Sequence, residues 1–120
     1  MGREKEMTNR HLLLFFFTRK GELFVKESQF QTQLIKDIKK RFPGCVIVKN
    51  DPEYIQGFPD LTILYGNHWA VLECKRSASA HHQPNQDFYI SQLDGMSFGR
   101  FISPENKEEV LRDLQSAFGS

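Results

Sequence analysis

The chain has little of what marks an exported or membrane-bound protein. It contains two cysteines in 120 residues, Cys45 and Cys74, without CxxC spacing, which favours buried thiols in a reducing compartment over a disulfide or a zinc site. Its longest apolar run, Leu12 to Phe17, is six residues long, against the ~18 that a membrane-spanning helix needs. No small-residue cleavage site follows this run. We therefore expect a cytoplasmic protein.

The chain also has no excess of charge of one sign. Its net charge is +1 with 26% charged residues, so it lacks the overall basic character of histone-like or ribosomal proteins. Any contact with nucleic acid must come from a local patch. An apolar content of 39% with 11 Phe suffices for one core at this length. A single domain over residues 1–120 is predicted, with residues 1–10 flexible.

Hydrophobic periodicity predicts a hairpin and then a helix in the first third of the chain. Residues 11–17 and 22–25 fit the two strands of a hairpin, although the first run also fits the start of a buried helix. Ser28 followed by Gln31 matches a capping box, and apolar residues at three- and four-residue steps continue the helix to Pro43-Gly44. Its outer face carries a basic stripe that either faces phosphate or is an ordinary solvated surface: Lys36, Lys39, Lys40 and Arg41.

The rest of the chain alternates strands with helices. A two-residue turn at Gly66-Asn67 joins two of the strands, a helix over 85–93 ends at Asp94-Gly95, and Ser103-Pro104 is a good start for the last helix. This order indicates an α/β domain with a central mixed sheet flanked by helices. The further strands are predicted at 45–48, 60–65, 68–75 and 97–102.

Two carboxylates face each other in this pattern. The turn makes the strands antiparallel, and its register places Asp60 opposite Glu73 at one end of the hairpin. Like charges at the ~5 Å separation of opposed residues repel, so a cation between them is expected, and oxygen ligands suit Mg²⁺ or Mn²⁺ rather than zinc. Lys75 lies on the same strand face as Glu73, where an ammonium group can hold a water and neutralise phosphoryl charge. Taken singly, Asp60 also fits a turn carboxylate, and Glu73 with Lys75 an exposed ion pair.

These residues resemble the PD-(D/E)xK motif of a nuclease superfamily, with Pro59-Asp60 as the PD and Glu73-Cys74-Lys75 as the ExK. The stretch Gly57 to Leu61 is similar to the opening of this motif in the VRR-NUC branch. Glu27 to Gln31 resembles the ExxxQ of that branch's first helix. Pro84-Asn85-Gln86 resembles the (S/T)-P-x-Q before its second core helix.

The resemblance implies a restriction-endonuclease-like fold with an αβββαβ core. The catalytic core would cover residues 27–114, and residues 11–25 would form an N-terminal hairpin extension. The metal ligands would be Asp60, Glu73 and the backbone carbonyl of Cys74. The metal would be Mg²⁺, with Mn²⁺ as a substitute.

Three other residues receive roles from the resemblance. Lys75 would orient the attacking water, and Glu27 would reach the metal directly or through water at the edge of the site. Gln86 would touch the scissile phosphate or hold Lys75 in place. The chain departs from the family pattern at Cys74, where an aliphatic residue is more common, and in the unmatched N-terminal hairpin, which would be a dimer or substrate element.

Basic and histidine residues near these motifs are candidate nucleic-acid contacts. Each also fits a solvated surface position. The adjacent histidines fit a second metal site, a general base or a phosphate contact, but a polar loop without such a role is the stronger reading because neighbouring loop side chains point in different directions. The candidates are Lys49, Arg76, His81, His82 and Arg100.

The residues and the resemblance together lead to the hypothesis of a Mg²⁺-dependent DNA endonuclease. Small stand-alone domains of this branch resemble phage and bacterial enzymes that cut branched DNA, so a Holliday junction or other branched or duplex DNA is the expected partner. A homodimer is expected because cutting both strands needs two sites. The alternative is a catalytically inactive DNA-binding or partner-binding module on the same fold. An RNA-directed role finds no aromatic stacking motif in the chain.

Overall fold

The computed structural model describes residues 15–17 and 23–119. Among the helices of these residues, none combines the length and the apolar character that crossing a bilayer would require. In chain order the elements are β1 (Phe15–Phe17), β2 (Leu23–Val25), α2 (Glu27–Arg41), β3 (Val46–Lys49), β4 (Leu61–Tyr65), β5 (His68–Cys74), α3 (Pro84–Met96), β6 (Gly99–Ile102) and α4 (Lys107–Ala117).

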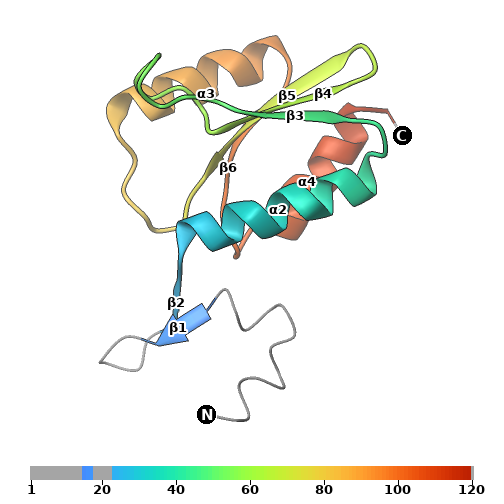
Figure 1. The fold of residues 1–120 in the computed structure, drawn as a ribbon. Helices are drawn as coiled ribbons and strands as arrows, with labels where there is room; N and C mark the ends of the chain where they lie inside the picture. The colour runs from blue at the N-terminus through green and yellow to red at the C-terminus, as the bar shows by residue number, and fades with distance from the viewer. Residues whose placement is uncertain (1–14, 18–22, 120) are drawn as a thin grey trace.

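The central sheet has the strand order β3-β4-β5-β6 (Figure 1). The first two pairings are antiparallel and the β5–β6 pairing is parallel, so the sheet is mixed, as predicted. β1 and β2 form a separate antiparallel sheet in which Phe15 lies opposite Val25. The predicted N-terminal hairpin is confirmed at these strands, and its residues 11–14 and 18–22 lie outside the described part of the chain.

The turn between β4 and β5 fixes their register. Gly66 has a φ of +62°, the left-handed conformation that a two-residue hairpin turn favours. Tyr65 pairs with His68, and the pairing continues until Leu61 lies opposite Leu72. These pairs match the predicted register, which is therefore confirmed. The agreement matters because a slip of one residue would turn every side chain of the strand to the other face.

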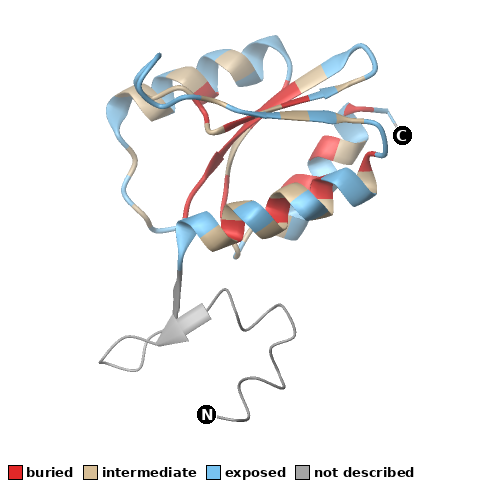
Figure 2. Ribbon diagram, viewed as in Figure 1, coloured by how far each residue is buried: buried red, intermediate tan, exposed pale blue. Residues whose placement is uncertain are grey.

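Helices cover both faces of the sheet, α2 and α4 on one side and α3 on the other (Figure 1). The main core lies between the sheet and the α2–α4 layer, where buried segments of the strands face buried segments of both helices (Figure 2). Burying a Leu, Ile or Phe side chain stabilises a fold by about 1.5–3 kcal/mol. The fully buried large side chains of this main core include Leu34, Ile38, Phe42, Leu61, Ile63, Leu72, Ile102, Leu111 and Leu114.

The start of α2 differs from the sequence prediction. The helix begins at Glu27, with Lys26 as an extended N-cap residue that forms no side-chain cap. The Phe30 N–H donates to the Lys26 carbonyl at 3.1 Å, which closes the first turn. Ser28 therefore lies inside the helix, and the predicted capping box is wrong. The consequence is that Glu27 stands in the first turn, where the helix dipole favours a negative charge.

The boundaries of α3 and α4 are also shifted. Gly95 has no positive φ, so it does not end α3, which continues to Met96. Before α4, the Ser103 N–H donates to Asn106 Oδ1 at 2.8 Å and closes a turn. Ser103 and Pro104, which were predicted to begin the helix, belong to this turn. Asn106 is the N-cap, and α4 begins at Lys107.

Gly57 lies in the loop before β4, and replacing it with alanine is expected to destabilise the protein by about 2–3 kcal/mol. Its φ is +86°, and an added Cβ would lie 2.5 Å from Cγ of Asn85. Gly44 is a matched control, with a φ of +90° and no atom within 4 Å of an added Cβ. Urea unfolding should show a loss of about 1 kcal/mol for Gly44→Ala, and equal losses for both variants would contradict the predicted contact.

Candidate active site

Asp60 and Glu73 interlock at the end of the β4–β5 hairpin. The Asp60 N–H donates to Glu73 Oε1 at 3.2 Å, and the Cys74 N–H donates to Asp60 Oδ2 at 2.9 Å. Each carboxylate thus accepts a main-chain hydrogen bond from the opposite strand. Glu73 is buried, with 4% of its surface exposed. The two acidic groups are brought together as predicted, and the hydrogen bonds hold both against the sheet.

A side chain from the end of β3 fixes the segment that carries Asp60. The Asn50 N–H donates to the Asp60 carbonyl at 2.8 Å. The Asn50 side-chain amide donates to the Pro59 carbonyl and to Thr62 Oγ1, both at 2.9 Å. Pro59 is fully buried. These contacts extend the order of the sheet by one residue beyond the start of β4 and position the carboxylate.

Gln86, in the first turn of α3, joins Lys75 to Glu73. Its Nε2 donates to Glu73 Oε2 at 2.9 Å, and its Oε1 accepts from Lys75 Nζ at 2.8 Å. Lys75 Nζ also donates to the His81 carbonyl at 3.0 Å. Lys75 is buried, with 9% exposure. Of the two roles that the resemblance offers for Gln86, this contact corresponds to the one that holds Lys75 in place.

The same glutamine caps the helix on which it lies. Gln86 Oε1 accepts from the Gln83 N–H at 2.9 Å, and the Gln83 side chain in turn accepts from the main chain of the first turn, which completes a capping box. Pro84 stands at the first position of the helix, where its missing N–H is not needed. One amide therefore serves both the start of α3 and the site.

Two residues of α2 reach the site from the other side. Glu27 lies close enough for its charge to interact with Asp60, Lys75 and Arg76. The Gln31 side chain, one turn later, lies close enough to the Cys74 thiol to lower its pKa. Burial raises the pKa of the Cys74 thiol, and the charges of Asp60 and Glu73 raise it further. A thiol with a raised pKa is a poor nucleophile, so Cys74 contributes packing and main-chain groups.

The acidic groups have raised pKa values, and burial is the largest cause for each. Burial, then the charge of Asp60, raises the pKa of Glu73 to about 8, against the opposing charge of Lys75. Burial also raises the pKa of Asp60, which the Cys74 N–H and Lys75 partly offset. Desolvation and the charge of Asp60 raise the pKa of Glu27. In the absence of a cation, the site therefore disfavours the ionised forms of these acidic groups.

The raised pKa of Glu73 predicts that stability falls as the pH rises in a buffer containing EDTA. A carboxyl group with a raised folded-state pKa contributes stability that is complete below its unfolded pKa and is lost as the pH rises through the folded pKa. For Glu73 this window runs from pH 4.5 to about 8. At about 1.4 kcal/mol per pKa unit, the free energy of unfolding should fall by on the order of 5 kcal/mol across the window.

Urea unfolding at a series of pH values measures this dependence, and Glu73→Gln should flatten it. The variant should also lose some stability at every pH, because the new amide nitrogen faces either the Asp60 N–H or Gln86 Nε2, both of which are donors. The slope and not the absolute stability is therefore the test. A Glu73→Gln slope equal to that of the wild type would contradict the raised pKa.

The candidate nucleic-acid contacts are not all gathered at the site. Lys49, at the end of β3, and Arg76, directly after Lys75, are exposed at the same end of the sheet as Asp60. His81 is exposed. Arg100 lies near the start of β6, where its guanidinium pairs with Asp94, stacks 4.3 Å over the Phe98 ring and is not brought together with the others.

His82 is partly exposed and stacks on Phe101, with ring centroids 3.8 Å apart.

The basic stripe of α2, like Arg100, is remote from the site, because Lys36 lies nine residues after Glu27, or about 14 Å along the helix axis. Arg41, at the end of this stripe, pairs with Glu108. Lys49, Arg76, His81 and His82 are therefore better placed than Arg100 or the stripe to contact a substrate at Asp60.

Sequence reasoning missed three polar side chains that shape the site. In the sequence, Asn50 begins an Asn-Asp-Pro stretch that indicates only the end of a strand. Its role becomes visible in the structure, where its side-chain amide donates to both the Pro59 carbonyl and Thr62 Oγ1. Nothing in the sequence marks Gln83 as the N-cap residue of a helix, since glutamine is not a preferred residue at that position. Gln31 lies in the ExxxQ pattern itself, four residues after Glu27 on the same helix face, and this spacing was the signal that could have identified it.

The donor set fits a hard divalent cation that keeps part of its water shell. Each oxygen of the Asp60–Glu73 pair has two lone pairs, so the oxygens that accept a hydrogen bond can each bind a second partner. In the described part of the chain no three His, Cys, Asp or Glu side chains converge into a ligand cluster. Two carboxylates with additional water and carbonyl oxygens are typical of Mg²⁺ and not of structural zinc.

Comparison with known proteins bears on the fold. No protein-family model matches the chain, and no curated protein matches it. A solved structure described as a VRR_NUC domain superposes on it with a TM-score of 0.52 and 20% sequence identity, covering 68% of this chain and 92% of that one. The chain has a VRR-NUC-type fold. This confirms the predicted restriction-endonuclease-like architecture.

Proposed function

We propose that the protein is a Mg²⁺-dependent endonuclease that hydrolyses phosphodiester bonds in DNA. The observation that carries the proposal is the pair of interlocked carboxylates, Asp60 and Glu73, joined through Gln86 to a buried ammonium group, Lys75. Keeping three such groups at one buried place destabilises a metal-free fold, as the raised pKa of Glu73 indicates. Perturbed acidic groups beside a lysine are typical of a site built for chemistry.

The residues of the site would have different roles in hydrolysis. Asp60, Glu73 and the Cys74 carbonyl would hold the cation, which when bound supplies positive charge to the phosphoryl oxygens and activates water. Lys75 would orient the attacking water and oppose the negative charge that grows on the phosphoryl group. Gln86 would keep the ammonium group in place through its 2.8 Å hydrogen bond.

Glu27 would complete the acidic edge of the site. Its position at the start of α2 lets its charge act on Asp60, and Lys75 and Arg76 both oppose that charge. A carboxylate at this edge of the site suits contact with the cation through water. It would therefore affect the affinity for Mg²⁺ more than the turnover.

We further propose a preference for branched DNA and action as a homodimer. Two strands of a junction or duplex require two cuts, and a symmetric pair of sites delivers both. A dimer would also double the local positive charge, which matters for a chain with a net charge of only +1. Sedimentation velocity with and without a four-way junction tests the stoichiometry.

A cleavage assay tests the activity itself. Purified protein is incubated with four-way junction, flap, nicked and linear duplex DNA, and with a matched RNA strand, in Mg²⁺, Mn²⁺ or EDTA. Cleavage of DNA that requires the divalent ion is expected, with the junction or flap cut fastest. Cleavage in EDTA would contradict the role of Asp60 and Glu73. Retained binding with no cleavage of any substrate would favour the inactive DNA-binding module on the same fold.

A further inference from the structure

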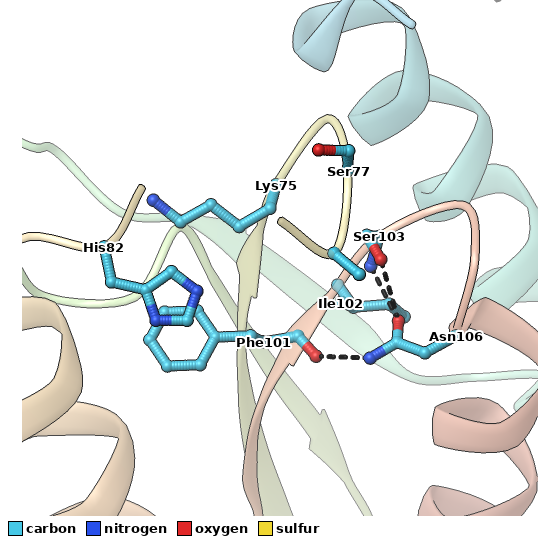
Figure 3. Close-up of a pocket in the computed structure, with 8 residues that line it drawn as sticks. Lys75, Ser77, His82, Phe101, Ile102, Ser103 and Asn106 are labelled. Atoms are coloured by element: carbon cyan, nitrogen blue, oxygen red, sulfur yellow. Dashed lines mark hydrogen bonds between the residues drawn. The ribbon is translucent and has the colours of Figure 1, made fainter. Parts of the chain in front are cut away.

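A pocket opens beside Lys75 (Figure 3). It contains about 290 Å³ of empty space, part of which is open to solvent. Lys75 forms one border, and the loop after β5 and the β6–α4 turn form the others. The remaining lining residues are Ser77, Ala78, His82, Phe101, Ile102, Ser103 and Asn106.

The wall formed by the β6–α4 turn is held in place by Asn106. Its Oδ1 accepts from the Ser103 N–H at 2.8 Å and from Ser103 Oγ at 3.3 Å, and its Nδ2 donates to the Phe101 carbonyl at 3.2 Å (Figure 3). Across the opening, the Ala78 N–H donates to Glu105 Oε1 at 3.0 Å, which ties the loop to the turn. The pocket is therefore formed before any ligand binds, as binding pockets usually are.

An aromatic platform forms the opposite side of the pocket. The His82 ring lies over the Phe101 ring (Figure 3), with centroids 3.8 Å apart and an interplanar angle of 14°. Asp87 contacts His82 Nδ1 at 2.9 Å, which fixes the ring orientation and leaves Nε2 for a ligand. His82 is partly exposed. A flat ring held from two directions and open to solvent is a surface on which another ring can stack.

This platform lies next to the carboxylate pair. Phe101 is the partner of Glu73 in the parallel β5–β6 pairing, and Glu73 in turn lies opposite Asp60. Adjacent strands are about 4.8 Å apart, so Asp60, Glu73 and Phe101 form a row across the end of the sheet. A phosphate at the carboxylates would have its neighbouring nucleoside within reach of His82.

We propose that this pocket takes an unpaired DNA nucleotide adjacent to the scissile phosphate, with its base stacked on His82. The proposal rests on the proposed nuclease function and names the form of DNA that the site accepts. Lys75 uses two of its three N–H donors on Gln86 and His81, which leaves one for a phosphate or water oxygen at the border of the pocket. A base can enter only when it is unstacked from its neighbours, so nucleotides at a branch or in a single strand are favoured over those in a duplex.

Base stacking can be tested apart from cleavage by equilibrium binding in EDTA. The probes are a fluorescein-labelled single-stranded DNA of 12 nucleotides and an abasic strand of the same length, which keeps the phosphates and lacks the rings. His82→Ala is expected to weaken binding of the base-containing strand by about 5- to 150-fold and to leave binding of the abasic strand unchanged. His82→Phe, which keeps a ring, should restore most of the affinity.

His81→Ala is the matched control, because it removes a neighbouring exposed imidazole from the same loop. Any loss that it causes should be equal for the two strands. Equal binding of His82→Ala and wild type to the base-containing strand, equal losses on both strands, or no binding by wild type would each overturn the proposal. If wild type binds with the expected base dependence but hydrolyses nothing in Mg²⁺, the nuclease function fails and the nucleotide pocket stands.

Discussion

Asp60→Asn is expected to lower DNA hydrolysis by about 1,000-fold or more, in a protein that is at least as stable as the wild type. The asparagine keeps an oxygen that can accept the hydrogen bond from the Cys74 N–H. It removes a negative charge that, after burial, is the main cause of the raised pKa of Glu73. Activity and stability should therefore change in opposite directions, which is the pattern expected of a residue kept for function.

Cleavage rates in Mg²⁺ and urea unfolding in EDTA measure the two effects for Asp60→Asn. Asp60→Ala should be equally inactive but less stable by about 1–3 kcal/mol, because it leaves the buried Cys74 N–H without an acceptor. Asp113→Asn, which alters an exposed carboxylate of α4, controls for the loss of one charge. Substantial cleavage by Asp60→Asn, or a large loss of its stability, would contradict the assignment.

Lys75→Ala is expected to lower turnover by about 100- to 10,000-fold with a smaller effect on the affinity for Mg²⁺. The side chain contacts Gln86 Oε1 and the His81 carbonyl, and both lose their charged donor. Its charge also lowers the pKa of Glu73, so that pKa should rise further in the variant. At neutral pH fewer ionised carboxylates would then be available for Mg²⁺.

Comparing Mg²⁺ titrations at pH 7 and pH 9 separates these two effects of Lys75. At pH 9 a larger fraction of the carboxylates is ionised in both proteins than at pH 7, so the Mg²⁺ affinities should lie closer together while the loss of turnover persists. Lys36→Ala removes an exposed lysine of α2 far from the site and should change neither quantity. Recovery of full turnover by Lys75→Ala at saturating Mg²⁺ would assign the lysine a role in metal binding alone.

The part of the site that could be predicted is the part that local geometry determines. A two-residue turn at Gly66-Asn67 leaves one register for the hairpin, and that register alone brings Asp60 opposite Glu73. Alternation along a strand then turns Lys75 to the same side as Glu73. None of these steps depends on how the helices pack, and the fold confirms the register.

The contacts that depend on packing could not be predicted. Gln86 reaches Lys75 only because α3 lies on the sheet with its first turn at the end of β5. Asn50 fixes the start of β4 through amide contacts that nothing in the local sequence indicates. Arg100 has the same charge as Arg76, yet it pairs with Asp94 and not with the site. Charge identifies candidates, and the tertiary structure selects among them.

The double contact of Gln86 gives the proposed nuclease a route to inactivity that does not require unfolding. Its side chain closes the first turn of α3 and also holds the lysine against the glutamate. Fraying of that single turn would release both at once, and fraying at helix ends requires far less free energy than global unfolding. Amide hydrogen exchange at Gln83 and Gln86 would then report directly the fraction of molecules in which Lys75 and Glu73 are no longer held together at any moment.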